Sequence, residues 1–171
     1  ILMSLSAIAA PSLIDFIVRM RVDNEISTLY RLLSIARNTA INSGQRVTLC
    51  PLNINNNCGT QWQNELSVFI DLNANNRFEP SNNETIIRIK PATKEGDKLE
   101  YGLNRSRVVY APTGRTTGWG SNGTFKYCPK DHDDKSRAVI VATSGRVYAS
   151  ADNDNDGKDE NRSNKEISCI N

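Results

Sequence analysis

Residues 34–51, SIARNTAINSGQRVTLCP, join the end of a long amphipathic helix directly to a β-strand and a cysteine. Gly44 stands where the helical pattern stops, and glycine readily takes the left-handed conformation that closes many helices. The run 46–50 that follows is rich in β-forming residues. This stretch predicts a long helix that ends near residue 43 and a β-rich part that starts immediately after it.

The helix carries a stripe of apolar residues at spacings of three and four, the pattern of one helical face. The stripe consists of Val18, Val22, Ile26, Leu29, Leu33, Ala36 and Ala40. A helix over 12–43 would be about 48 Å long at about 1.5 Å per residue, so a sheet or neighbouring helices must cover the stripe. We predict that residues 18, 22, 26, 29 and 33 of this stripe serve an assembly helix. The alternative is an ordinary core helix.

Residues 1–13 are apolar except for Ser4, Ser6 and Pro11. A membrane-spanning helix needs about 20 apolar residues. We therefore expect this segment to span a membrane only if further apolar chain precedes Ile1. A signal-peptide remnant and a buried helix start are the alternatives.

After Gly44 the pattern becomes β, in short runs bounded by turn residues. The runs lie at 46–50, 66–71, 85–89, 99–101, 107–110, 124–128, 138–142, 146–149 and 166–170. A helix followed by strands predicts the α+β class, with a long N-terminal α-helix packed on one face of an antiparallel β-sheet. We divide the chain into an N-terminal helix, 1–43, and a β-rich head domain, 44–171. Residues 139–149 predict a hairpin that turns at Ser144-Gly145.

Composition bounds the function. The 171 residues carry a net charge of +2, too little to argue for nucleic acid, and aromatic residues make up only 6%. The sequence has no GxSxG, HExxH, GxGxxG or P-loop motif. The only histidine, His132, stands in the charged stretch KDHDDK. We therefore expect no enzyme.

Four cysteines, none of them in a CxxC motif, leave little material for a zinc site beside a single histidine. They allow three pairings, and we expect two disulfides in an oxidising compartment rather than four buried thiols. We predict that Cys50 pairs with Cys58 around an Asn-rich loop. Cys128 would then pair with Cys169 and tie a late strand to the C-terminus.

The polar segment 152–165 contains the start of a calcium-binding loop. Asp152, Asp154 and Asp156, followed by Gly157, reproduce a D-x-D-x-D-G pattern, and Glu160 stands at the ninth position. Alternating acids on a tight loop can point at one cation. We expect a hydrophilic, solvated loop here and no cofactor. Weak Ca²⁺ binding by these four acids is the alternative.

The calcium pattern is incomplete at its end. The twelfth position, which should hold a bidentate acid, is Ser163, and Glu166 comes three residues too late. A weaker copy of the pattern occurs at Asp71, Asn73 and Asn75, without the glycine.

Several segments resemble the GspH/FimT family of minor pilins. IAAPSL (8–13) before a long helix is similar to the N-terminal half-helix of type IV pilins and pseudopilins. SIARNTAINSGQRVTLCP resembles the family's helix-to-strand signature and is the most specific match. LSVFIDLNANNRFEP (66–80) resembles its strand and acidic turn. RVVYAPTGRTTGWGSNGTFKYC (107–128) and VIVATSGRVY (139–148) resemble its two late hairpin regions.

The resemblance implies a non-enzymatic assembly subunit of a Gram-negative bacterium. Such proteins are cleaved by a prepilin peptidase, methylated and held in the inner membrane by the helix, with the head in the periplasm and later at the pilus surface. They join other minor pilins and the major pilin in a complex that primes or caps a pilus used in twitching motility. The extent of the resemblance favours a pilus subunit, and a type II secretion pseudopilin is the alternative.

A third alternative is DNA capture in natural transformation. Some proteins of this family carry a Gly-Arg-x-Arg motif, and here the corresponding residues are Gly145-Arg146-Val147-Tyr148, without the second arginine. Arg115 is another candidate phosphate contact. Because phosphate binding needs several clustered cations, we expect nucleic acid not to be a partner.

Overall fold

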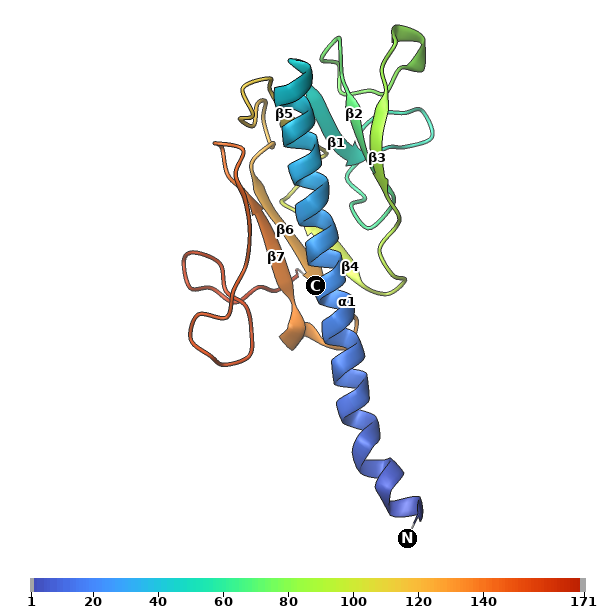
Figure 1. Cartoon of the computed structure of the whole chain (residues 1–171), viewed down its shortest axis with the longest axis vertical. Coiled ribbons are helices and arrows are strands. Elements are labelled where there is room, and N and C mark those ends of the chain that lie inside the picture. The colour runs from blue at the N-terminus through green and yellow to red at the C-terminus, as the bar shows by residue number, and fades with distance from the viewer. Residues whose placement is uncertain (1, 170–171) are drawn as a thin grey trace.

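The computed structural model describes the backbone of residues 2–169 and the side chains of residues 13–169. It contains one long helix, α1 (Leu2–Ser43), followed by eight strands. Figure 1 shows α1 lying across the strands, with its N-terminal part extending beyond them. The side chains of residues 1–12, most of the segment that could enter a membrane, lie outside the described residues. Within the part of the chain that is described, α1 has no stretch both long and apolar enough to cross a bilayer.

The helix ends where the sequence predicts. Gly44 has a φ of +65°, in the left-handed region, directly after the last helical residue, Ser43. Strand β1 (Val47–Pro51) starts three residues later and is buried along its whole length. The change from helix to strand within 34–51 is therefore confirmed.

The strands form two antiparallel sheets of four. The first has the order β3-β2-β1-β5 and contains β1, β2 (Leu66–Ile70), β3 (Ile86–Lys90) and β5 (Val108–Tyr110). The second has the order β4-β6-β7-β8 and contains β4 (Lys98–Tyr101), β6 (Gly123–Cys128), β7 (Arg137–Val141) and β8 (Val147–Ala149). Two short 3₁₀ helices, η1 (Pro80–Asn82) and η2 (Asp133–Lys135), lie between strands.

The predicted α+β class, a long helix packed on antiparallel strands, is confirmed. The strands form two sheets and not one, because β5 is the last strand of the first sheet. The outer edge of β5 is occupied by its own following loop: Val109 N donates to Ser121 Oγ (3.2 Å), and Val109 O accepts from Thr117 N (3.0 Å). No ladder position remains for a strand of the second sheet there. Helix α1 contacts strands of both sheets and joins them into one core.

The prediction of a ninth strand over 166–170 is wrong for residues 166–169, which the structure describes. Glu166 makes only an isolated bridge with Glu160, and Ile167 N donates to Asp159 O (2.9 Å). The segment pairs with the loop before it and not with a strand, so no ladder develops. Residue 170 lies outside the described part of the chain.

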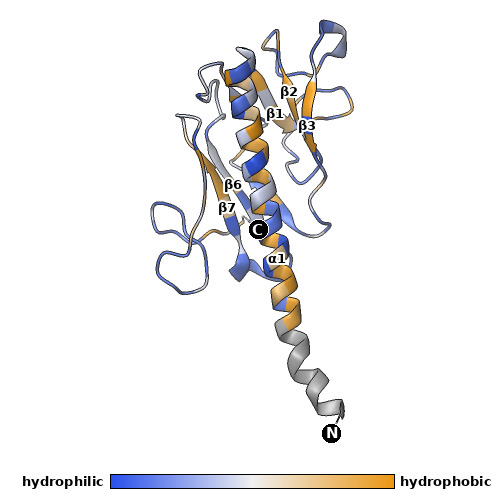
Figure 2. Ribbon diagram, viewed as in Figure 1, coloured by the Kyte–Doolittle hydropathy of each residue, from blue (hydrophilic) through white to orange (hydrophobic). Residues whose placement is uncertain are grey.

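The predicted stripe of α1 faces the core. All seven of its residues, from Val18 to Ala40, are buried, together with Leu32. Under them, Trp62 packs edge-on against Tyr101 and Phe125, with ring centroids 5.0 Å away in each case, and donates from Nε1 to Arg105 O (2.7 Å). Figure 2 shows the resulting alternation of hydrophobic and hydrophilic residues along α1.

Two disulfides hold the head, in the predicted pairing. Cys50 on β1 is bonded to Cys58, eight residues on, and Cys128 at the end of β6 is bonded to Cys169. The second bond holds the C-terminal segment against the second sheet, where Lys126 Nζ also donates to Ser168 O (2.9 Å).

The predicted hairpin 139–149 is confirmed. Strands β7 and β8 pair from Val139↔Ala149 to Val141↔Val147. The turn is closed by Gly145 N, which donates to Ala142 O (2.8 Å), and Gly145 has a φ of +81°.

Candidate assembly surface and acidic loop

The part of α1 that extends beyond the strands carries a second apolar face. Its members are Leu13, Ile14, Phe16, Ile17 and Met20, each more than half exposed. We call this set the exposed apolar face. Figure 2 shows it as a hydrophobic stretch of helix without a sheet behind it. A helix face of this size exposed to water is typical of a surface that binds another apolar surface.

The residues predicted to serve assembly lie elsewhere. Val18, Val22, Ile26, Leu29 and Leu33 are buried inside this chain, so they hold the helix to its own head domain. The exposed apolar face lies outside this set, and the sequence analysis did not single it out. The signal that could have revealed it is a second set of apolar residues at helical spacing, at 13, 17 and 20.

Ion pairs attach the middle of α1, from Asp15 to Glu25, to the head. Lys135 on η2 pairs with Asp15 (Nζ–Oδ1 2.6 Å), and its hydrogen bond is the main cause that lowers the pKa of the Asp15 carboxyl. Further along the helix, Glu25 pairs with the buried Lys90 of β3 and accepts from Thr93 Oγ1 (3.0 Å). These contacts fix the angle at which the helix leaves the head.

Asp97, whose side chain is buried, makes a third attachment. It pairs with Arg21 of α1 (Nε–Oδ2 2.9 Å) and accepts hydrogen bonds from the Tyr127 hydroxyl and from Lys130 N (2.8 Å). Burial, and then the hydrogen bond to Asp97, raise the pKa of Tyr127 above its usual range. The hydroxyl therefore remains a donor to Asp97 at any physiological pH.

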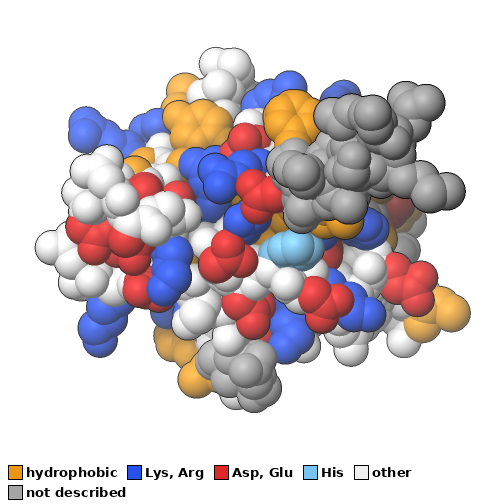
Figure 3. All heavy atoms as spheres, turned by 90° about the horizontal axis from the view of Figure 1, so that it is seen from below, with side chains coloured by type: hydrophobic (Ala, Val, Ile, Leu, Met, Phe, Trp, Pro, Cys, Tyr) orange, Lys and Arg blue, Asp and Glu red, His pale blue; other side chains and the backbone are white. Residues whose placement is uncertain are grey.

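The two arginine-bearing turns lie side by side. Thr116, next to Arg115, donates from N (3.3 Å) and from Oγ1 (3.1 Å) to Thr143 O in the turn that carries Arg146. Arg115 and Arg146 are both exposed. Arg137 on β7 differs from these two arginines, because it pairs with Asp159 and Asp23. Figure 3 shows acidic and basic side chains interspersed on the face seen from the N-terminal end of α1.

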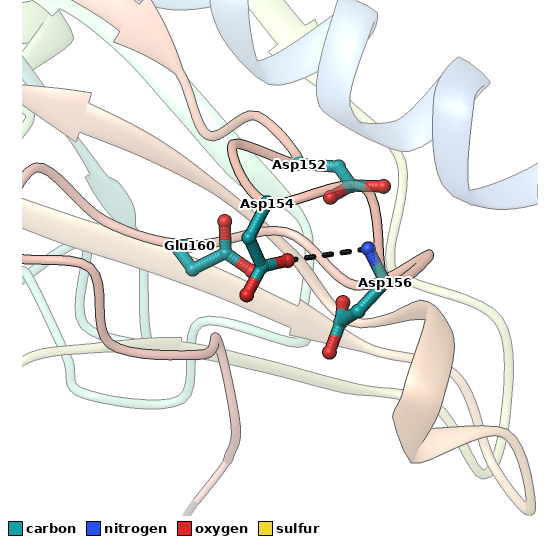
Figure 4. A group of neighbouring side chains, drawn as sticks. All are labelled: Asp152, Asp154, Asp156 and Glu160. Carbon is teal, nitrogen blue, oxygen red and sulfur yellow. Dashed lines mark hydrogen bonds between the residues drawn. The ribbon is translucent and has the colours of Figure 1, made fainter.

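The acidic loop, residues 152–160, is folded by its own aspartates. Asp152 accepts hydrogen bonds from Asn155 N (2.7 Å) and Gly157 N (3.0 Å), Asp154 accepts from Asp156 N (3.2 Å), and Asp156 accepts from Lys158 N (2.9 Å). These turns bring Asp152, Asp154, Asp156 and Glu160 together, with one carboxylate oxygen from each lying within 4.8 Å of the others. Figure 4 shows the four side chains close together. The structure thus brings together the four residues that the sequence pattern offers as cation ligands.

Glu160 differs from the three aspartates. They are exposed, whereas Glu160 is 5% exposed. Its Oε2 accepts from Asn153 N (2.8 Å), and its Oε1 is buried without a hydrogen-bond partner. The burial of Glu160 comes from its bridges to Ala151 and Glu166, which the sequence does not reveal.

The weaker copy of the pattern, residues 71–79, folds in the same way. Asp71 accepts from Asn75 N and Asn76 N (both 3.1 Å), Asn73 Oδ1 accepts from Asn75 N (3.1 Å), and Asn75 Oδ1 accepts from Arg77 N (2.9 Å). The glutamate at its ninth position, Glu79, accepts from the side-chain amides of Asn73 and Asn75 (both 2.7 Å) and of Asn82 (2.9 Å). The bond from Asn73 is the largest of the effects that lower the pKa of Glu79.

Comparison with known proteins identifies the family. Residues 25–145 match the family described as type II transport protein GspH. The chain belongs to the GspH family. The match covers the C-terminal part of α1 (25–43), both sheets up to the β7–β8 turn, and the Cys50–Cys58 loop. This GspH-family chain is therefore pilin-like over most of its length.

Solved structures share the fold of this GspH-family chain. The type IV minor pilin FimU of Pseudomonas aeruginosa superposes with a TM-score of 0.58 at 17% identity, over 80% of this chain and 92% of FimU. The minor pseudopilin EpsH of the type 2 secretion system of Vibrio cholerae superposes with a TM-score of 0.53 at 17% identity, over 77% of this chain and 97% of EpsH. No curated protein has significant sequence similarity to the chain.

Proposed function

We propose that this GspH-family chain is a minor pilin that primes or caps the assembly of a type IV pilus. Its helix would be held in the inner membrane and then in the filament, with the head in the periplasm and later at the tip. The observation that carries the proposal is the exposed apolar face on the part of α1 that leaves the head. An apolar helix end whose described side chains are more than half exposed supports packing against the helices of other minor pilins and of the major pilin.

The ion pairs of α1 support the same role. A subunit that packs by its helix needs a defined angle between helix and head, and Asp15, Arg21 and Glu25 hold that angle through Lys135, Asp97 and Lys90. The head then occupies a fixed position relative to the filament axis.

A type II secretion pseudopilin is the second candidate, because the fold is also that of EpsH. A clean deletion in the source organism separates the two. Under the pilus proposal, sheared surface pili and twitching zones fall several-fold and secretion of exoproteins is unchanged. Loss of exoprotein secretion with normal pili would instead assign the chain to a type II secretion system. Normal pili, twitching and secretion, with no second copy of the gene, would reject both.

A point variant tests the assembly surface directly. Phe16→Asp/Ile17→Asp places two charges on the exposed apolar face, where they cost the isolated fold little because both side chains are already exposed. Asn24→Asp is the control: it adds a charge to an exposed position of the same helix, one turn beyond the last residue of that face, Met20. We expect the double variant to be present in cells, to keep its thermal midpoint within about 2 °C and to fail to restore piliation, whereas Asn24→Asp restores it. Full piliation by the double variant would contradict the role of this face.

A further inference from the structure

Glu160 holds a buried oxygen that the chain leaves without a partner. Glu160 is only 5% exposed, and its Oε1 accepts no hydrogen bond. A buried, charged oxygen without a donor or a cation beside it is strongly unfavourable, and native proteins rarely keep one. Oε1 therefore calls for a positive partner that the described chain does not supply.

That partner would also face the three aspartates. One oxygen from each of Asp152, Asp154, Asp156 and Glu160 lies within 4.8 Å of the others, and Figure 4 shows the four side chains close together. Four like charges at such separations repel one another. Two basic side chains beside the loop bind other groups: Lys158 pairs with Glu166 (2.9 Å), and Arg162 lies over the ring of Tyr148, 3.8 Å from its centroid.

The loop of residues 71–79 shows another way to satisfy the glutamate at the ninth position, with amide donors in place of a cation. In residues 71–79, with the same turns, the amide groups of Asn73 and Asn75 donate to Glu79 and close the loop. In residues 152–160 the corresponding positions are Asp154 and Asp156, whose carboxylates cannot donate when ionised. One loop is closed by its own hydrogen bonds, and the other needs a cation for the same purpose.

We propose that Asp152, Asp154, Asp156 and Glu160 bind one Ca²⁺ ion. Ca²⁺ takes six to eight oxygen ligands at about 2.3–2.6 Å, so two ligands of one ion lie at most about 5 Å apart, which fits the observed limit of 4.8 Å. The three aspartates are exposed, and water can therefore complete the coordination. Mg²⁺ demands a smaller and nearly ideal octahedron, which a loop of four converging carboxylates does not favour.

The ion would strengthen the attachment of the helix. Asp159 is next to the Glu160 ligand and holds Arg137 (Oδ2–Nε 2.9 Å), and the same guanidinium pairs with Asp23 of α1. Asp152 and Gly157 of the loop line a cleft with Arg19 and Asp23 of the helix. An ordered loop thus supports the ion pair that links helix and head.

The test uses the chain of residues 1–171, stripped with EGTA and titrated with CaCl₂ by isothermal titration calorimetry. We expect one Ca²⁺ per chain with a Kd of about 10⁻⁴–10⁻³ M, and a thermal midpoint about 3–6 °C higher in about 5 mM Ca²⁺. Glu160→Gln and Asp154→Ala should lose both effects. Asp131→Asn removes an exposed charge outside the loop and should keep them. No heat and no thermal shift in the wild-type chain, or equal shifts with Mg²⁺, would overturn the proposal.

A second variant keeps the proposal testable if the single substitutions unfold the loop. Asp154→Asn/Asp156→Asn gives residues 152–160 the amides found in residues 71–79, which can donate to Glu160. We expect this variant to lose the calcium response and to melt about 2–4 °C higher than the wild type in EGTA. A double variant that still binds Ca²⁺, or that is less stable than the wild type in EGTA, would contradict the assignment of these two residues as ligands.

Discussion

Gly145 in the β7–β8 turn packs directly on the carbonyl oxygen of Gly114 in the loop after β5. A β-carbon on Gly145 would lie 1.8 Å from that oxygen and 3.2 Å from Arg37 Nε. Arg37, on the last turns of α1, donates from Nε to the same Gly114 oxygen (2.9 Å). The end of the helix, the first sheet and the second sheet therefore meet at this contact, and it requires a residue without a side chain.

Gly145→Ala should destabilise the fold strongly. The substitution adds a methyl group where there is no space, at a φ of +81°. Overpacking costs about 1–3 kcal/mol and the left-handed conformation about 1–2 kcal/mol, so we expect a loss of about 2–5 kcal/mol in denaturant unfolding. Gly44→Ala is the control, because Gly44 has a φ of +65° and no neighbour within 4 Å of its β-carbon position. Equal losses for both variants would show that the Gly145–Gly114 contact is not tight.

The contact at Gly145 also shows what the sequence can and cannot predict. The helix stripe, the helix end at Gly44 and the turn at Gly145 depend on neighbouring residues, and each could be predicted from local spacing. The four carboxylates of the acidic loop are equally local, within nine residues, and the structure brings them together. The side-by-side packing of the Gly114 and Gly145 turns depends on residues 31 positions apart, and no local pattern encodes it.

Contacts between distant residues also explain where the structure differs from the expectations drawn from the sequence. The division into two sheets depends on Ser121 and Thr117 occupying the outer edge of Val109, and strand runs alone do not reveal which edges are occupied. The ion pair between Asp23 and Arg137 joins residues 114 positions apart. The burial of Glu160, on which the calcium proposal depends, follows from its bridge to Glu166 and not from the D-x-D-x-D-G pattern.

The two disulfides should contribute unequally to stability. In the chain-entropy model, closing the eight-residue separation of Cys50–Cys58 stabilises by about 2.5 kcal/mol, and closing the 41-residue separation of Cys128–Cys169 by about 4 kcal/mol. We expect Cys128→Ser/Cys169→Ser to lose more stability than Cys50→Ser/Cys58→Ser in denaturant unfolding. Hydrogen exchange should rise near residue 167 in the first variant only. A larger loss for the Cys50–Cys58 variant would mean that loop length does not control the effect.

The arginines on the two neighbouring turns should bind duplex DNA only weakly. Arg115 and Arg146 are two exposed cations on a chain of net charge +2, and phosphate binding of useful strength needs more of them. At physiological salt we expect a Kd in the non-specific range of about 10⁻⁴–10⁻⁶ M. The Arg115→Ala/Arg146→Ala variant should change it no more than Arg88→Ala, an exposed arginine on β3, in fluorescence anisotropy. Submicromolar, salt-sensitive binding that only the double variant abolishes would establish a DNA-binding role.

The stability of the 71–79 loop should depend on pH through Glu79. Hydrogen bonds from Asn73 and then Asn75 lower the pKa of the Glu79 carboxyl below its ordinary 4.5. A carboxylate with a lowered pKa in the folded state stabilises the fold fully above its unfolded pKa, and that contribution is lost as the pH falls through the folded pKa. Glu79→Gln lacks this contribution at every pH. Its deficit in thermal midpoint relative to the wild type should therefore be largest at pH 6–7 and should shrink as the pH falls below about 4. Asn73→Asp removes the first donor to Glu79. In that background, the deficit in thermal midpoint caused by Glu79→Gln should vary less with pH. A deficit that stays constant from pH 7 to pH 3 would show that the amide donors do not act on the charged form of Glu79.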